Sequence, residues 1–164
     1  MFRFKNEWNF QAPIPVVWEK LSDIESWPRW WTAFRKSMVR ITGTAQQPVL
    51  LADCEVRGVI PLTFRFCLEP THFHAPHLIE FNSSGDLVGS GEFQLGPVDG
   101  ATRVTIRWDV QGKGFALSLL SAFPVTRILL RWNHKLVMKS GQRALREVVE
   151  GGATARSQDP GQAK

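Results

Sequence analysis

The 164-residue chain contains no tyrosine, only two cysteines and no uninterrupted apolar run long enough to cross a membrane. Its longest apolar stretch, 115–132, is broken by Pro124, Arg127 and Arg131, whereas a membrane-spanning helix needs about 20 apolar residues. The N-terminus lacks the apolar core of a signal peptide. With two cysteines and no CxxC motif, we expect a reduced, cytoplasmic setting and no disulfide framework.

Signatures of common catalytic mechanisms are also missing. The sequence has no GxSxG, HExxH, P-loop or GxGxxG motif, so hydrolase, zinc-protease and nucleotide-dependent chemistry are not indicated. His72, His74 and His77 are close in sequence, but no carboxylate or cysteine accompanies them at ligand spacing. We therefore expect exposed histidines in a loop, and we predict no metal and no cofactor.

What the chain has is aromatic side chains without hydroxyl groups, namely seven Trp and eleven Phe. Such side chains suit a dry core or an apolar cavity. Trp27, Trp30 and Trp31 fall within five residues, and on a helix predicted for 24–34 they share one side, which Phe34 extends. These rings are expected either to belong to the core or to roof a cavity and contact its ligand.

Hydrophobic periodicity divides the rest of the chain into strands and helices. Period-two alternation in FRFKNEWNFQ predicts a first strand, and helical spacing predicts a short helix after Ala12. Further strands are expected near 36–42, 48–58, 62–69, 77–83, 87–95 and 101–111. Because the last of them alternates between an apolar and a charged face, the sheet has one wet face and is antiparallel.

A long helix is predicted over 124–150, ended by two glycines and followed by a disordered polar tail, 151–164. Apolar spacing assigns its inner face to Val125, Leu129, Trp132, Leu136, Ser140, Ala144 and Val148. The chain is expected to form one domain, 1–150, without internal repeats.

The net charge of +5 is unevenly distributed. Residues 1–111 contain 11 Lys/Arg and 12 Asp/Glu, whereas residues 112–164 contain 9 and 3. Basic residues recur every four positions on the predicted long helix: Arg127, Arg131, Lys135, Lys139 and Arg143. Because like charges at this spacing repel, this face is expected to be either simply solvated or a docking surface for an anionic membrane or an acidic partner. No nucleic-acid-binding motif is present, so no nucleic acid is expected.

Four segments carry a family resemblance: APIPVVWEKLSDIESWPRW at 12–30, GDLVGSGEFQL at 85–95, TRVTIRWDV at 102–110 and RWNHKLVMKSGQRALREVV at 131–149. In this order they resemble the START-like (SRPBCC) helix-grip proteins, specifically the polyketide cyclase/dehydrase and lipid-transport branch. The resemblance implies an α+β fold in which a seven-stranded curved antiparallel sheet wraps around a long C-terminal helix, with two short helices after the first strand. It also implies a cavity between sheet and helix that binds an apolar small molecule.

The candidate ligand-binding residues are those expected to face this cavity. They are Asn6, Trp8, Trp27, Trp30, Phe34, Cys54, Phe64, Phe66, Gly89, Gly91, Phe93, Thr102, Trp108, Leu129, Trp132 and Leu136. Two glycines on one strand face indicate a sharply curved sheet, extra cavity volume, or both. Asn6, Thr102 and Asn82 are the polar exceptions, of which the first two are candidates for orienting a ligand. Cys54 is interpreted as a small buried hydrophobe.

Three functions remain open at this stage. The apolar inward faces favour a carrier or binding protein for a lipid- or polyketide-like molecule. The alternative is a cyclase- or dehydratase-like enzyme, and a one-residue register error that turned Glu80, Glu92 or Asp109 inward would favour it. The third is a membrane-facing carrier docked through the basic helix, with 112–123 as its gate.

Overall fold

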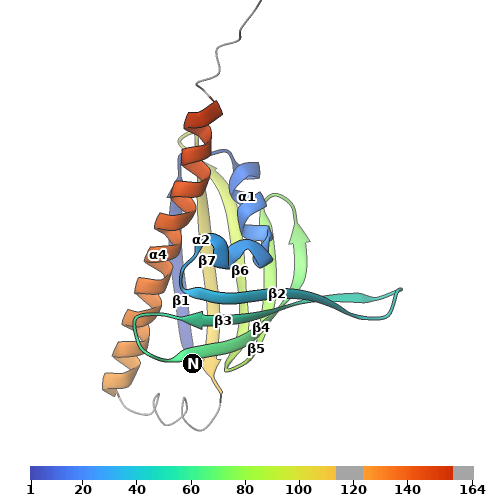
Figure 1. The fold of residues 1–164 in the computed structure, drawn as a ribbon, viewed down its shortest axis with the longest axis vertical. Coiled ribbons are helices and arrows are strands. Elements are labelled where there is room, and N and C mark those ends of the chain that lie inside the picture. The colour runs from blue at the N-terminus through green and yellow to red at the C-terminus, as the bar shows by residue number, and fades with distance from the viewer. Residues whose placement is uncertain (114–123, 157–164) are drawn as a thin grey trace, which may run out of the picture.

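In the computed structural model, which describes residues 1–113 and 124–156, a curved antiparallel sheet lies against one long helix (Figure 1). The elements are β1 (Phe2–Phe10), α1 (Ile14–Ser22), the 3₁₀ turn η1 (Ile24–Ser26), α2 (Trp27–Trp30), β2 (Phe34–Gly43), β3 (Pro48–Arg57), β4 (Thr63–His74), β5 (Leu78–Gly85), β6 (Leu87–Val98), β7 (Ala101–Gly112) and α4 (Pro124–Arg156). The described residues form a seven-stranded sheet in the order β1-β7-β6-β5-β4-β3-β2. The predicted α+β helix-grip fold is confirmed. Apart from its first two residues, the predicted gate at 112–123 lies outside the described part of the chain.

The first and last strands of the chain pair at one edge of the sheet, where β1 is the edge strand and β7 lies next to it. In the β1–β7 ladder, Phe4 lies opposite Trp108 and Trp8 lies opposite Val104. Because side chains alternate along a strand, these residues share the face that is turned toward α4. Both strands therefore contribute aromatic rings to the space between the sheet and the helix.

Strand β4 is longer than predicted. The sequence pattern predicts a strand near 62–69, but the ladder with β5 continues to His74 through a register shift between Pro70 and His72. A bulge of this kind accommodates the proline. His72 and His74 therefore belong to the exposed end of β4 rather than to a loop.

The tryptophan segment does not form the single helix predicted for 24–34. A 3₁₀ turn leads into α2, which ends at Trp30, and Trp31 leaves the helix with φ −102° and ψ 94°. The next residues join the sheet, because Phe34 begins β2 and pairs with Val56. Consequently the three rings do not share one face: Trp27 and Trp31 are buried, whereas Trp30 is only partly buried.

Helix α4 begins at Pro124 as predicted but continues through the two glycines to Arg156. Its inner face differs from the predicted one. Four residues of the predicted inner stripe are exposed in the structure: Val125, Leu129, Trp132 and Val148. The buried or cavity-facing residues are Leu130, Asn133, His134, Val137, Met138, Gly141, Leu145 and Val149. Gly141 accounts for this orientation, because a Cβ atom there would lie 2.4 Å from the Trp31 indole.

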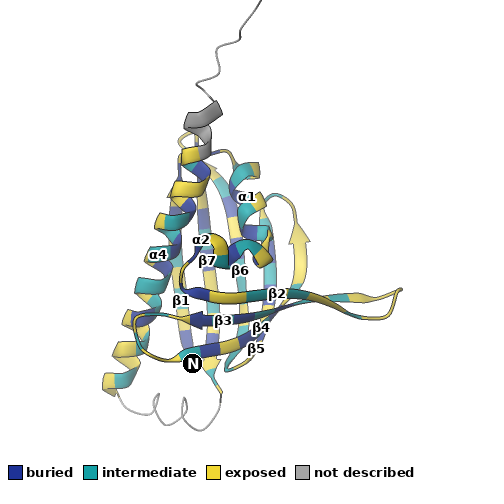
Figure 2. Cartoon of the chain, viewed as in Figure 1, coloured by how far each residue is buried: buried dark blue, intermediate teal, exposed yellow. Residues whose placement is uncertain are grey.

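The interior between sheet and helix has two unlike ends (Figure 2). At the end covered by α1, the side chains are almost fully buried: Trp8, Phe10, Val17, Leu21, Val104 and Leu145. At the other end, where β1 begins and β7 ends, several inward-facing residues stay partly accessible, among them Phe4 and Trp108. The candidate site lies at this second end.

Candidate ligand cavity

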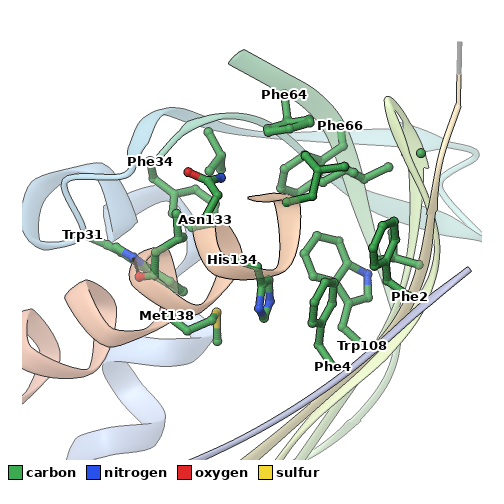
Figure 3. Close-up of a pocket in the computed structure, with 16 residues that line it drawn as sticks. Phe2, Phe4, Trp31, Phe34, Phe64, Phe66, Trp108, Asn133, His134 and Met138 are labelled. Atoms are coloured by element: carbon green, nitrogen blue, oxygen red, sulfur yellow. Dashed lines mark hydrogen bonds between the residues drawn. The ribbon is translucent and has the colours of Figure 1, made fainter. Parts of the chain in front are cut away.

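A cavity of about 120 Å³ lies between the inward face of the sheet and the first half of α4 (Figure 3). It is lined by Phe2, Phe4, Trp31, Phe34, Val56, Phe64, Phe66, Leu87, Trp108, Val110, Gly112, Leu130, Asn133, His134, Val137 and Met138. Apart from two indole N–H groups, Asn133 and His134 supply the polar side-chain atoms of this lining. Such a lining suits an apolar molecule with a small number of polar groups.

Strands β1 and β7 build one part of the sheet wall of the cavity. The rings of Phe2 and Phe4 stack with a centroid separation of 5.8 Å and an interplanar angle of 3°. Trp108 donates its indole N–H to Ser83 Oγ at 3.3 Å. With its polar edge satisfied in this way, the Trp108 ring presents apolar surface to the cavity.

Trp31 closes the cavity from the side of the tryptophan segment. Its indole N–H donates to the Val137 carbonyl oxygen at 3.0 Å, and its ring lies 5.6 Å from Trp8 and 4.7 Å from Phe34, measured between centroids. The indole also fits against α4 where Gly141 has no side chain. Trp31 therefore contacts both α4 and the sheet, and it also lines the cavity.

His134 places an imidazole in the cavity. Its ring stacks on Phe4 at a centroid separation of 3.6 Å (Figure 3), and among the described residues neither ring nitrogen has a hydrogen-bond partner. Burial lowers the pKa of His134 to about 4. At neutral pH the ring is therefore uncharged and offers one donor and one acceptor.

Asn133 supplies a second polar group beside the imidazole. The side chain is buried, and its Oδ1 accepts a hydrogen bond from the Ile60 backbone N–H at 3.1 Å. This approach depends on Gly58, where a Cβ atom would lie 2.3 Å from the same oxygen. No described residue accepts from the Asn133 amide nitrogen, and Asn133 is one of the residues that line the cavity.

The sixteen predicted site residues are only partly brought together. Those that line the cavity are Phe34, Phe64, Phe66 and Trp108. Others belong to the surrounding core: Trp8, Trp27, Cys54, Phe93 and Thr102. Thr102 does not face the cavity, because its hydroxyl donates a hydrogen bond to the Ala12 carbonyl oxygen at 2.6 Å. Cys54 is buried, and this burial raises the pKa of its thiol to about 12.

The polar and glycine positions of the prediction also lie outside the lining. Asn6 is half-buried on β1. A Cβ atom at Gly89 would lie 1.9 Å from the Asp109 carbonyl oxygen, and one at Gly91 would lie 2.5 Å from the Phe81 ring. The glycines therefore admit close approach of neighbouring groups, as a curved sheet requires, and do not open additional volume.

The remaining predicted residues are directed elsewhere. Trp30 stacks on Trp31 with a centroid separation of 5.6 Å and does not reach the cavity. Leu129 and Trp132 are exposed on α4, and Leu136 is half-buried outside the lining. All three belong to the helix stripe that the structure turns away from the sheet.

The acidic residues that a register error would have brought inward lie on the outer face of the sheet. Glu92 pairs with Arg107, and Asp109 pairs with Arg3 at 3.9 Å. Glu80 lies opposite Glu92 on the same face. Within the described lining there is consequently no carboxylate, and Asn82 is likewise exposed.

Several lining residues were not predicted. The alternation in FRFKNEWNF already marked Phe2 and Phe4 as inward-facing, so these two were accessible to sequence reasoning. Trp31 was recognised only as part of a helix face. No sequence pattern indicated that Asn133 and His134 line the cavity, because a polar residue on an amphipathic helix is normally assigned to the solvent side.

Neither a metal centre nor a membrane span is found in the part of the chain that the structure describes. Over 1–113 and 124–156, His, Cys, Asp and Glu form no group of three or more able to hold a metal ion. His77 instead places its Nδ1 atom 3.1 Å from the Leu95 carbonyl oxygen. No described helix is both long and apolar enough to cross a bilayer.

An apolar cavity held between a curved antiparallel sheet and a C-terminal helix is the arrangement of a START-like ligand-binding or polyketide cyclase/dehydrase domain. The family model "Polyketide cyclase / dehydrase and lipid transport" matches residues 1–150, and the chain belongs to this family. Among curated proteins, none matches the chain.

Solved structures with the same fold include three of particular relevance. The Zhui aromatase/cyclase from Streptomyces sp. R1128 is 15% identical, with coverage of 99% of both chains and a TM-score of 0.68. A START superfamily protein from Mycobacterium smegmatis is 16% identical, covering 91% of this chain and 97% of that one at a TM-score of 0.69. The protein TTHA0849 from Thermus thermophilus is 16% identical and covers 88% of this chain and 97% of its own, with a TM-score of 0.68. At these identities the likeness shows the fold alone.

Proposed function

We propose that the chain binds a lipid- or polyketide-like small molecule in the cavity between the sheet and α4 and serves as its carrier or binding protein. The observation that supports this function is the lining, in which the described aromatic and aliphatic side chains surround two polar ones, Asn133 and His134. Burial of about 200 Å² of apolar ligand surface would contribute about 5 kcal/mol. A binder of this kind needs no catalytic group.

The two polar side chains indicate what the ligand carries. Asn133 offers a donor, and the neutral His134 offers a donor and an acceptor. A carbonyl or hydroxyl group on an otherwise apolar ligand satisfies them. The cavity volume of about 120 Å³ is close to that of a cavity of about 150 Å³ that binds benzene, so the enclosed portion is matched to one ring.

A cyclase- or dehydratase-like enzyme is the second candidate, and His134 is the observation that favours it. In such an enzyme, the Asn133 amide would polarise a ligand carbonyl while the imidazole accepted a proton. However, a pKa of about 4 makes His134 a weak base near neutral pH, where acid–base catalysis works best with a pKa close to the working pH. The carrier is therefore the first candidate.

Native mass spectrometry of freshly purified protein, followed by solvent extraction, tests ligand binding. Val137→Phe places a larger side chain in the cavity, whereas Val148→Phe adds the same atoms outside it. We expect a stoichiometric apolar adduct on the unmodified protein and on the Val148 variant, with at least tenfold lower occupancy in the Val137 variant. Equal occupancy in both variants would contradict the assignment of the ligand to this cavity.

The same extracts separate a carrier from an enzyme. Ligand released from a carrier keeps its mass after prolonged incubation, whereas a dehydratase-like enzyme releases a product that has lost water. His134→Gln retains a hydrogen-bonding group and His134→Phe does not, so a carrier keeps most of its affinity in the first variant and loses about tenfold in the second. Loss of product formation in both variants, with binding retained, would establish the enzyme.

A separate proposal concerns the anionic partner predicted for the basic helix. Arg127, Arg131, Lys135, Lys139 and Arg143 all keep part of their surface accessible to solvent. They are therefore accessible to a negatively charged surface.

A further inference from the structure

The first half of α4 turns an apolar face to solvent. Four side chains on the side away from the cavity are unusually accessible: Val125 at 78%, Ile128 at 68%, Leu129 at 42% and Trp132 at 48%. Because residues three and four apart are neighbours on a helix, these side chains form one continuous strip. We call it the outer apolar strip.

The connection between β3 and β4 enlarges this strip. It reaches α4 (Figure 1), where the Ile60 backbone N–H donates to Asn133. Its side chains Val59 and Leu62 are 62% and 36% exposed. The outer apolar strip and this connection thus both expose apolar side chains to solvent, and clustered exposure of this kind marks an interaction site.

Basic residues flank the outer apolar strip without acidic neighbours. Arg131, Lys135 and Lys139 are exposed, and we call them the basic flank. Between Pro124 and Arg146 the sequence contains no Asp or Glu. The helix is therefore apolar on its outward side and cationic beside it.

We propose that the outer apolar strip and the basic flank dock this protein on an anionic lipid bilayer. A helix with an apolar face and flanking Lys and Arg binds in the plane of a membrane interface, where apolar burial and attraction to anionic headgroups add. Trp132 is of the residue type that favours this depth. Charge complementarity selects the lipid surface over a second copy of this chain, because a symmetric dimer would bring two basic flanks together.

Docking in this orientation places α4 between the membrane and the cavity, so that only this helix separates the two. Leu130, which lines the cavity, lies between exposed Leu129 and Arg131, and the Arg127 guanidinium lies 5.8 Å from the ring centroid of cavity-lining Phe2. Docking itself rests on the surface of α4 and does not require that the cavity hold a ligand.

Vesicle co-flotation tests the inference with phosphatidylcholine vesicles and with vesicles that also contain phosphatidylglycerol. We expect the full chain to bind the anionic vesicles at least tenfold more strongly than the neutral ones, and high salt to weaken the binding. The combined change Arg131→Glu, Lys135→Glu and Lys139→Glu should reduce partitioning by roughly a hundredfold or more. Ile128→Glu should reduce it severalfold.

Matched controls make the same changes elsewhere on the surface. Arg29→Glu, Arg35→Glu and Lys36→Glu reverse three exposed charges on elements other than α4, and Ile41→Glu alters a side chain that is 73% exposed on β2. Both controls should keep most of the vesicle binding. Equal losses in the two triple variants would overturn the inference in favour of unspecific attraction.

Two further results would also overturn it. One is absence of binding to anionic vesicles. The other is a concentration-dependent dimer, seen by analytical ultracentrifugation, that Ile128→Glu abolishes while vesicle binding is unchanged. The altered side chains do not line the cavity, so ligand occupancy measured in parallel separates a failure of docking from a failure of ligand binding.

Discussion

The two ends of the interior use the same elements in opposite ways. Near α1, the second half of β1, the first half of β7 and the C-terminal part of α4 bury Trp8, Val104 and Leu145 almost completely. At the other end, the remaining halves of these elements surround a cavity with Phe4, Trp108 and Leu130. One end thus stabilises the fold, and the other is open to a ligand.

The two ends differ because side chains pack against one another differently across the interior. At the packed end, Trp8 meets Phe10 edge to face at a centroid separation of 6.2 Å, and toward the cavity it meets Trp31 at 5.6 Å. At the cavity end, α4 contributes the polar side chains of Asn133 and His134. Neighbouring aliphatic groups do not fill the space beside these two side chains, and a cavity remains there. A single helix therefore combines a closely packed region with a cavity-lining region.

Truncating a leucine at each end is expected to show the largest contrast. Leu145→Ala removes a fully buried side chain and should lower the free energy of unfolding by about 4 kcal/mol. Leu130→Ala enlarges an existing cavity and should cost about 1 kcal/mol. Guanidinium unfolding measures both values, and similar losses would contradict the division into two ends.

Acidification should weaken the cavity end selectively. The pKa of His134 falls from 6.5 to about 4 on folding, so the unfolded chain binds the extra proton between these values. Stability from this group is complete above pH 6.5 and is lost as the pH falls toward 4, by at most about 3 kcal/mol. In His134→Phe this component of the pH dependence should disappear; an unchanged profile would contradict the assignment.

Gly141→Ala tests the junction between the two ends. The new Cβ atom would collide with the Trp31 indole, and such overpacking should cost about 2 kcal/mol. Gly151→Ala is the matched control, since a Cβ atom there meets nothing within 4 Å and should stabilise the helix by about 0.5–1 kcal/mol. Thermal unfolding of both variants gives the comparison, and the same sign of change in both would refute this account.

The smallest effect is expected at a hydrogen bond of the packed end. Thr102→Val removes the donor to the Ala12 carbonyl and leaves that oxygen unpaired, which should cost about 1.5 kcal/mol. Thr105→Val, on the outer face of the same strand, should change stability by less than about 0.5 kcal/mol. Urea unfolding resolves the two, and equal effects would show that the buried bond contributes little.

The strands could be predicted well because one face of each is wet. Period-two alternation located β3 and β7 to within one residue at each end. It also placed Thr102 and Trp108 on the inward face. Local alternation does not report how far a strand continues past a bulge, so the end of β4 was missed.

The helix side of the cavity could not be predicted because α4 is apolar on two sides. Spacing alone favoured the stripe through Leu129 and Trp132, which the structure exposes. The orientation depends on Gly141 meeting Trp31 and on Asn133 meeting Ile60. Both are contacts between distant parts of the sequence that no local pattern contains.

The edge pairing of β1 with β7 also has a kinetic consequence. Phe4 and Trp108 are paired across roughly a hundred residues, and pairings of such high sequence separation form slowly. During synthesis, β1 leaves the ribosome first but must wait for the last strand and for α4 before its inward face is covered. The wall around Phe2 and Phe4 is thus among the last parts to assemble. A molecule held there would bind after closure, and would extend the lifetime of the native state by slowing its opening rather than by accelerating folding.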